Sequence, residues 1–200
     1  MELIIKLVVL VFSIVFHEVA HGYAAYRLGD PTAKASHRLT LNPLAHIDPM
    51  GSILLPLILV FTNSPVLFGW AKPVPFNPGY FRNVKKGVMI VGAAGPAANL
   101  SLATVAAAVF RLFTPGGVVG FFLVHVCVTN VILAMFNLMP IPPLDGSRIA
   151  LGFMPSGLAR SYLKLERFGF LIIFGLLWLG ALDNVVWPLA DGMLRLLLPR

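Results

Sequence analysis

The stretch FSIVFHEVAHGYAAY, which runs from Phe12 to Tyr26, lies inside the first hydrophobic run of the chain. It carries two histidines and a glutamate, His17, Glu18 and His21, among residues that are mostly apolar. A charged side chain near the centre of a bilayer is disfavoured by about 2.5–3.5 kcal/mol on insertion scales. A penalty of this size requires a compensating role for these three residues.

The composition of the whole chain indicates an integral membrane protein. Of the 200 residues, 58% are hydrophobic and only 12% are charged, and the mean hydropathy is +0.87. A soluble domain would carry about twice that charged fraction. Several uncharged runs approach or exceed the roughly 20 residues that cross a bilayer as a helix. The basic residues lie between these runs, so we expect them to set the orientation in the membrane and not to bind nucleic acid.

The pattern of apolar runs predicts an all-α polytopic membrane protein. About four runs are long enough to be transmembrane helices, at 3–26, 87–113, 118–138 and 168–186. The segment 49–71 is also uncharged, but two prolines interrupt it, and we expect it to be re-entrant. The partly alternating stretch 33–42 and the proline-rich stretch 66–76 predict a small β element on the cytoplasmic side.

The distribution of lysine and arginine supports the re-entrant interpretation of 49–71. If this segment returns to the side from which it came, 11 of the 15 basic residues fall on one side of the membrane and four on the other. If it crosses, the division is nine to six. The positive-inside rule favours the first arrangement, which places residues 27–86 on the cytoplasmic side.

The spacing of the two histidines predicts a metal site. His17 and His21 are four residues apart, so on a helix they share one face and can bind one zinc ion. Glu18 lies next to them and can act as a general base toward zinc-bound water. The alternative is a chance H-E-x-x-H sequence with satisfied core histidines. The penalty for a charge in a lipid-embedded helix disfavours that alternative.

A catalytic zinc site requires a third protein ligand and an open coordination position. Of the eight acidic residues, five lie at expected membrane edges and Asp48 opens the segment 49–71. Asp145, in NLMPIPPLDGSR, follows the third expected helix. If 49–71 is re-entrant, that helix ends at the same membrane depth as His17, which makes Asp145 the best candidate.

Three motifs together resemble the site-2 protease family of intramembrane zinc metalloproteases. They are HEVAH in the first expected helix, GPAAN at 95–99 and NLMPIPPLDG at 137–146, and they occur in the order typical of the family. The stretches LNPLAHIDPMG and GWAKPVPFN are similar to the compact branch of the family, which has no PDZ or CBS domain.

The resemblance implies a role for each matched residue. His17, His21 and Asp145 would be the ligands of one zinc ion per chain, and Glu18 would be the catalytic base. Asn137 would be a polar group near the substrate backbone or the oxyanion. The resemblance also implies a single intramembrane metalloprotease domain over 1–200, with a catalytic core at 1–148 and C-terminal helices at 149–200.

Small residues in GPAAN permit close helix approach, and an asparagine can donate hydrogen bonds across helices. We therefore expect Gly95 and Asn99 to give structural support, with catalytic involvement as the alternative.

The predicted function is that of a zinc metalloendopeptidase acting on membrane-embedded or juxtamembrane substrates. Its partners would be a transmembrane protein substrate and the lipid bilayer, and the oligomeric state stays open. We expect a multi-pass protein of the cell membrane whose active site opens to the cytoplasmic side. A membrane metal-binding or transport protein is the main alternative, and a catalytically inactive scaffold is a third. The H-E-x-x-H spacing disfavours the transporter, and the complete set of ligands and base disfavours the scaffold.

Overall fold

The computed structural model describes residues 1–62 and 70–198, and this part of the chain is helical and irregular, with no strand. Its elements are α1 (Glu2–Arg27), α2 (Thr32–Ala35), η1 (Pro43–His46), η2 (Pro49–Leu54), α3 (Leu55–Phe61), η3 (Pro78–Tyr80), α4 (Val84–Phe113), α5 (Gly117–Asn137), α6 (Asp145–Phe153), α7 (Ser156–Leu163), η4 (Glu166–Phe168), α8 (Gly169–Trp178) and α9 (Asp183–Leu197). Among the described residues, α1, α4 and α5 are the three helices long and apolar enough to cross a membrane.

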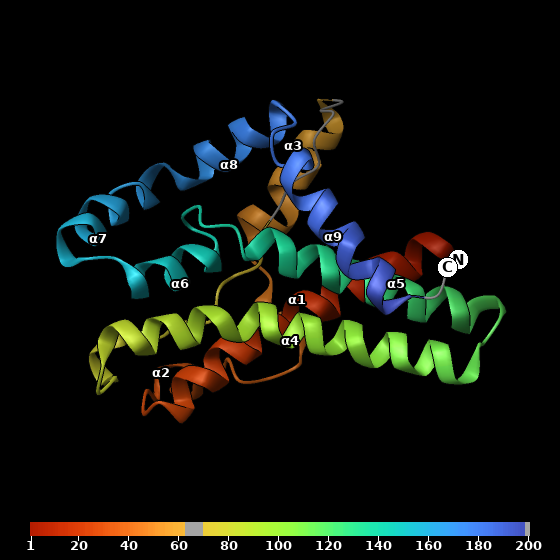
Figure 1. Ribbon diagram of the computed structural model, residues 1–200, viewed down its shortest axis with the longest axis horizontal. Coiled ribbons are helices and arrows are strands. Elements are labelled where there is room, and N and C mark those ends of the chain that lie inside the picture. The colour runs from red at the N-terminus through yellow and green to blue at the C-terminus, as the bar shows by residue number, and fades with distance from the viewer. Residues whose placement is uncertain (63–69, 199–200) are drawn as a thin grey trace.

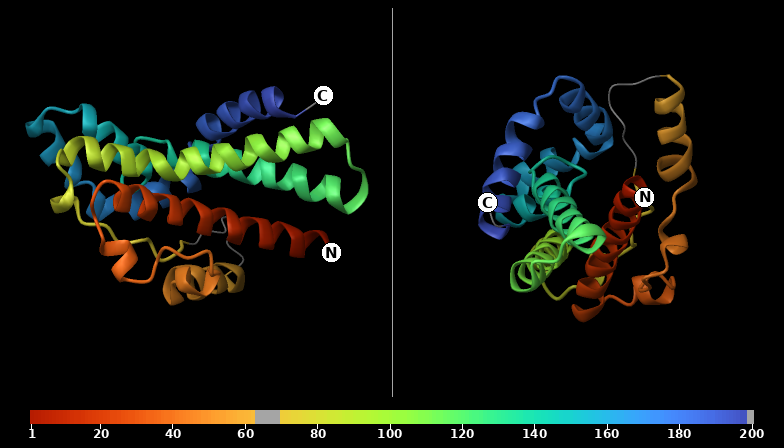
Figure 2. Two further views of the ribbon diagram at one scale, coloured as in Figure 1. Left: turned by 90° about the horizontal axis from the view of Figure 1, so that it is seen from below. Right: turned by 90° about the vertical axis from the view of Figure 1, so that its right-hand side faces the viewer.

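These three long helices run side by side and form the centre of the molecule (Figures 1 and 2). A tight turn joins α4 to α5, and the backbone of Thr114 is left-handed there, with φ of 40°. Small buried residues on α4, such as Ala103 and Ala107, pack against Val131 and Ala134 of α5. Small side chains allow such helices to approach closely where lipid, not water, surrounds them. The α9 helix completes this core on the other side of α5.

The two ends of the long bundle differ (Figure 2). The N-terminus and the turn between α4 and α5 lie at one end. The C-terminal end of α1, the start of α4, and the helices α6 and α7 lie at the other end. The α3 helix flanks the bundle on the side of α1.

The prediction of a β element is wrong for the described residues. In the stretch 33–42, Thr32–Ala35 forms a single helical turn, and the backbone of His37 is left-handed, with φ of 53°. In the stretch 66–76, residues 66–69 lie outside the described part, and 70–76 are irregular. Pro73 and Pro75 have no backbone N–H, so this segment cannot form a regular ladder of hydrogen bonds.

The backbone after residue 69 is instead bonded to the start of the segment 49–71. The amide of Trp70 donates to the carbonyl of Gly51 at 3.1 Å, and the amide of Lys72 donates to the carbonyl of His46 at 2.9 Å. The Ser52 hydroxyl donates to the carbonyl of Trp70 at 2.8 Å. The two ends of the segment 49–71 therefore lie side by side.

The fourth predicted transmembrane helix, 168–186, is not one helix. It is divided into α8 and the start of α9 by a turn at Gly180, whose φ is +64°. The amide of Gly180 donates to Leu177 O and the amide of Ala181 to Leu176 O, both at 3.0 Å. This pair of hydrogen bonds is the Schellman arrangement that ends helices at a left-handed glycine. Neither piece is long enough to cross a bilayer alone.

Candidate metal centre

Three buried side chains from two distant parts of the sequence meet at one point. His17 and His21 lie on successive turns of α1, and Asp145 is the first residue of α6. The Asp145 Oδ2 atom lies 3.0 Å from His17 Nε2 and 3.2 Å from His21 Nε2, and the two Nε2 atoms are 3.0 Å apart. Ligands of a tetrahedral zinc ion, with bonds near 2.0–2.1 Å, lie about 3.3 Å from one another. The three atoms therefore fit one zinc ion, and they form a group able to hold a metal.

Hydrogen bonds to the other ring nitrogens aim both histidines at this point. His17 Nδ1 lies 2.6 Å from Asn99 Oδ1, and His21 Nδ1 lies 2.6 Å from the carbonyl of Val91. Both partners can only accept a hydrogen bond, so each Nδ1 carries the proton. Each Nε2 then has a free lone pair, which is the form of imidazole that binds a metal.

The orientation of Asn99 is itself fixed by two residues that the sequence analysis missed. Asn99 Nδ2 donates to Asn130 Oδ1 at 2.7 Å and to the carbonyl of Ser13 at 3.3 Å. Asn130 Nδ2 donates in turn to Ser13 Oγ and to the carbonyl of Val126, both at 2.8 Å. Because its amino group is committed to these acceptors, Asn99 must turn its oxygen toward His17. Polar side chains inside apolar helices were the available signal for Asn130 and Ser13.

Replacing Asn130 with leucine is expected to weaken zinc binding about 10–100-fold, the usual effect of losing a group that orients a ligand. Without Asn130, the Asn99 amide can turn its amino group to His17, which favours the tautomer that carries its proton on Nε2. Competition with a chromophoric chelator measures the dissociation constant. Cys127→Ala is the control, since Cys127 is buried one turn away on α5. An unchanged zinc affinity in Asn130→Leu would show that the network does not orient His17.

The GPAAN motif lies on the face of α4 that meets the metal centre. A side-chain carbon at Gly95 would overlap His21 Nε2 and would lie 2.6 Å from His17 Nε2. One turn earlier, a side-chain carbon at Gly92 would lie 2.8 Å from the Cβ of Arg148. The two glycines thus allow α1 and α6 to approach α4 closely enough for their side chains to meet.

The electrostatics of Asp145 favour its ionised form. Burial opposes ionisation, but the neighbouring imidazoles of His17 and His21 outweigh it and hold the pKa of this carboxyl below its usual range. Arg148 Nη1 lies 3.3 Å from Asp145 Oδ1 and places a positive charge beside the carboxylate. An ionised carboxylate is the form that binds a metal.

Glu18 and Asn137 face the same cavity as the metal centre. This cavity of about 410 Å³ is lined by His17, Glu18 and Asn137 and otherwise mainly by apolar side chains. Glu18 Oε2 accepts a hydrogen bond of 2.8 Å from the amide of Val74, a contact that the sequence analysis did not foresee. Asn137 Nδ2 donates to the carbonyl of Leu133 at 2.9 Å, which leaves its second amino hydrogen for another acceptor.

His46 and Asp48, which precede the segment 49–71, are not part of the metal centre. His46 is buried, and its Nε2 atom lies 2.9 Å from the carbonyl of Thr40. Asp48 Oδ1 accepts hydrogen bonds from the amides of Met50 and Gly51 at the start of η2. Both side chains therefore form hydrogen bonds with backbone groups near the start of the segment 49–71.

Comparison with known proteins finds several relatives that share most of this chain. YwhC of Bacillus subtilis is 38% identical over 196 residues, which are 92% of this chain and 85% of YwhC. Rip2 of Mycolicibacterium smegmatis is 32% identical over 177 residues, 86% of this chain and 66% of Rip2. MJ0611 of Methanocaldococcus jannaschii is 31% identical over 149 residues, 73% of this chain and 69% of MJ0611. All three carry names that describe them, provisionally, as zinc metalloproteases. No family model and no solved structure matches the chain.

Proposed function

Because the chain belongs to the site-2 protease family of zinc metalloproteases, as YwhC and MJ0611 indicate, we propose that it cleaves other proteins in or beside their membrane segments. The observation that carries this proposal is the group of His17, His21 and Asp145, with Glu18 and Asn137 on one shared cavity. This group lies among helices that are long enough to cross a membrane.

In the proposed hydrolysis, metal binding and proton transfer are assigned to different residues. His17, His21 and Asp145 would hold the zinc ion, which when bound polarises the scissile carbonyl and makes water more acidic. The Val74 amide holds Oε2 of Glu18, so Oε1 is the atom free to take the proton from the attacking water. Glu18 can then pass this proton to the leaving amide nitrogen.

Asn137 is proposed to bind the substrate carbonyl. Its second amino hydrogen can donate to the oxygen on which negative charge develops during attack. Such a donor acts most strongly in a cavity with apolar walls, where little water competes. A membrane helix must unwind before its peptide bonds become accessible, and the exposed backbone then needs polar partners of this kind.

The activity is expected to depend on zinc. Purified wild-type protein in detergent is incubated with a panel of single-span membrane proteins, and the products are identified by mass spectrometry. Treatment with a chelator should abolish cleavage, and stoichiometric zinc should restore it, because hydrolysis needs both the metal and the base. A metal-binding or transport protein would bind zinc but cleave no member of the panel. Equal cleavage by the zinc-free and zinc-loaded protein would contradict the proposal.

We also propose that the site opens to the cytoplasmic side of the cell membrane. Single cysteines at Ser36 and Lys85, in a Cys127→Ser background, should react from the same side with a membrane-impermeant reagent. Both positions are exposed: Ser36 directly follows α2, and Lys85 lies in the first turn of α4. A cysteine at Gly116, in the turn between α4 and α5, is the control and should react from the opposite side. Labelling of Ser36 and Lys85 from opposite sides would contradict this orientation.

A further inference from the structure

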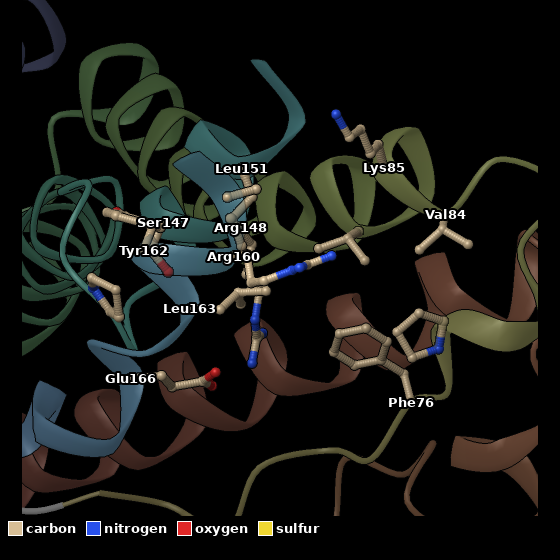
Figure 3. Close-up of a pocket in the computed structure, with 14 residues that line it drawn as sticks. Phe76, Val84, Lys85, Ser147, Arg148, Leu151, Arg160, Tyr162, Leu163 and Glu166 are labelled. Atoms are coloured by element: carbon tan, nitrogen blue, oxygen red, sulfur yellow. The ribbon is translucent and has the colours of Figure 1, made fainter. Parts of the chain in front are cut away.

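A second cavity lies at the end of the bundle where α4 begins. It has a volume of about 570 Å³ and is bounded by the first turn of α4, by α6 and α7, and by the segment 76–78 (Figure 3). Most of its wall is apolar and includes Phe76, Val88, Leu151 and Leu163. The volume lies within the range of about 300–1,000 Å³ that is typical of sites for small ligands.

The polar groups in this cavity carry an excess of positive charge. Lys85, Arg148 and Arg160 line it, against a single carboxylate, Glu166 (Figure 3). Lys85 Nζ donates to the carbonyl of Met154 at 3.0 Å, which leaves two of its three hydrogens for other acceptors. Within residues 1–62 and 70–198, Arg160 and Glu166 form no hydrogen bond or ion pair through their side chains. The cavity therefore favours a ligand with a negatively charged group.

This cavity shares a wall with the metal centre. Arg148 extends along one side of it, with its guanidinium 5.2 Å from the centre of the Phe76 ring. The same guanidinium contacts Asp145 at 3.3 Å. Pro142 lines this cavity, whereas Pro143 lines the cavity of the metal centre. A ligand here would touch the segment that positions a metal ligand.

We propose that this cavity binds an acidic phospholipid, with the phosphate at Arg160 and Arg148 and an acyl chain along the apolar wall. Two observations support a lipid. Basic residues beside a membrane attract anionic headgroups, and here the cations stand beside apolar side chains. Val84 and Leu163 are about half exposed, so the apolar wall continues onto the outer surface, where an acyl chain can lie. The proposal does not depend on the peptidase activity.

Spin-labelled lipids test the proposal directly. Full-length, zinc-loaded protein is placed in phosphatidylcholine vesicles, and the motionally restricted fraction of labelled phosphatidylglycerol is compared with that of labelled phosphatidylcholine. The wild type should prefer phosphatidylglycerol. Arg160→Ala should lower this preference about fivefold, the factor for one basic residue beside an acidic headgroup. Leu163→Trp, which fills the cavity without a change of charge, should lower it as well.

Lys164→Ala is the matched control, because Lys164 follows Leu163 but does not line the cavity. It should keep the wild-type preference. An equal loss in Lys164→Ala and Arg160→Ala would overturn the proposal, since general surface charge would then explain the binding. An unchanged preference in Leu163→Trp would also overturn it. Displacement of the labelled lipid by inorganic phosphate at equal concentration would also overturn the proposal, because the ligand of the cavity would then be a free anion and not a lipid.

Discussion

Glu18→Gln is expected to lower the rate of cleavage by about 10²–10⁴-fold, the range for loss of a general base, while the protein keeps its zinc. Glu18 is not one of the three side chains that converge as metal ligands. Glutamine keeps the shape of the side chain and an oxygen that can accept from the Val74 amide. It cannot take a proton from water. Initial rates on one verified substrate and elemental analysis of the same preparation measure both quantities.

Glu2→Gln is the matched control for this prediction. It makes the same chemical change on the same helix, at the exposed N-terminal end of α1. It should leave both the zinc content and the rate unchanged. If Glu18→Gln cleaves at the wild-type rate, Glu18 is not the base. If Glu18→Gln loses its zinc, Glu18 is a metal ligand and the assignment of three ligands is wrong.

Gly95→Ala is expected to lower zinc occupancy to less than about a tenth of the wild-type value. The added methyl group would overlap His21 Nε2 and lie 2.6 Å from His17 Nε2, so one ring must leave its position or α4 must move. Overpacking of this kind typically destabilises a structure by about 1–3 kcal/mol, and 1.4 kcal/mol is a factor of ten in binding. Zinc per chain, measured by elemental analysis after dialysis, gives the result.

Gly175→Ala is the control for the glycine change itself. Gly175 also lies inside a helix, and a side-chain carbon there would meet no atom within 4 Å apart from the neighbouring residues and backbone of its own helix. It should keep full zinc occupancy. Circular dichroism of Gly95→Ala separates a local defect at the metal centre from loss of the fold. A Gly95→Ala protein with full zinc occupancy would contradict the close approach of α4 to the two histidines.

The outline of the metal centre could be predicted from the sequence because its main signals are local or topological. The spacing of His17 and His21 depends only on the helical repeat, and the depth of Asp145 depends only on the number of membrane crossings. The structure brings these three side chains together. The hydrogen-bond network of Asn99, Asn130 and Ser13, which orients His17, could not be predicted in this way. Asn130 lies 117 residues from Ser13, with which it shares a hydrogen bond, and no local pattern indicates such a pair.

The errors in the predicted fold have physical causes in particular residues. The prolines of the stretch 70–76 favour an extended backbone, which predicted a strand, but its amides donate to Gly51, His46 and Glu18, and the two prolines have no amide hydrogen for a ladder. The run 168–186 is apolar enough for a membrane helix, yet Gly180 takes a left-handed conformation and ends α8. A glycine inside an apolar run is compatible with either outcome, and tertiary packing decides between them.

Cleavage of a single-span membrane substrate in heavy-oxygen water, followed by mass spectrometry of both products, tests the proposed chemistry most directly. The zinc-loaded wild type should cut one bond in or beside the membrane segment and place heavy oxygen in the new carboxyl group. Zinc-loaded Glu18→Gln should give almost no product. Cleavage by Glu18→Gln at the same bond and at the wild-type rate would contradict the assignment of Glu18, His17, His21 and Asp145 as a hydrolytic centre.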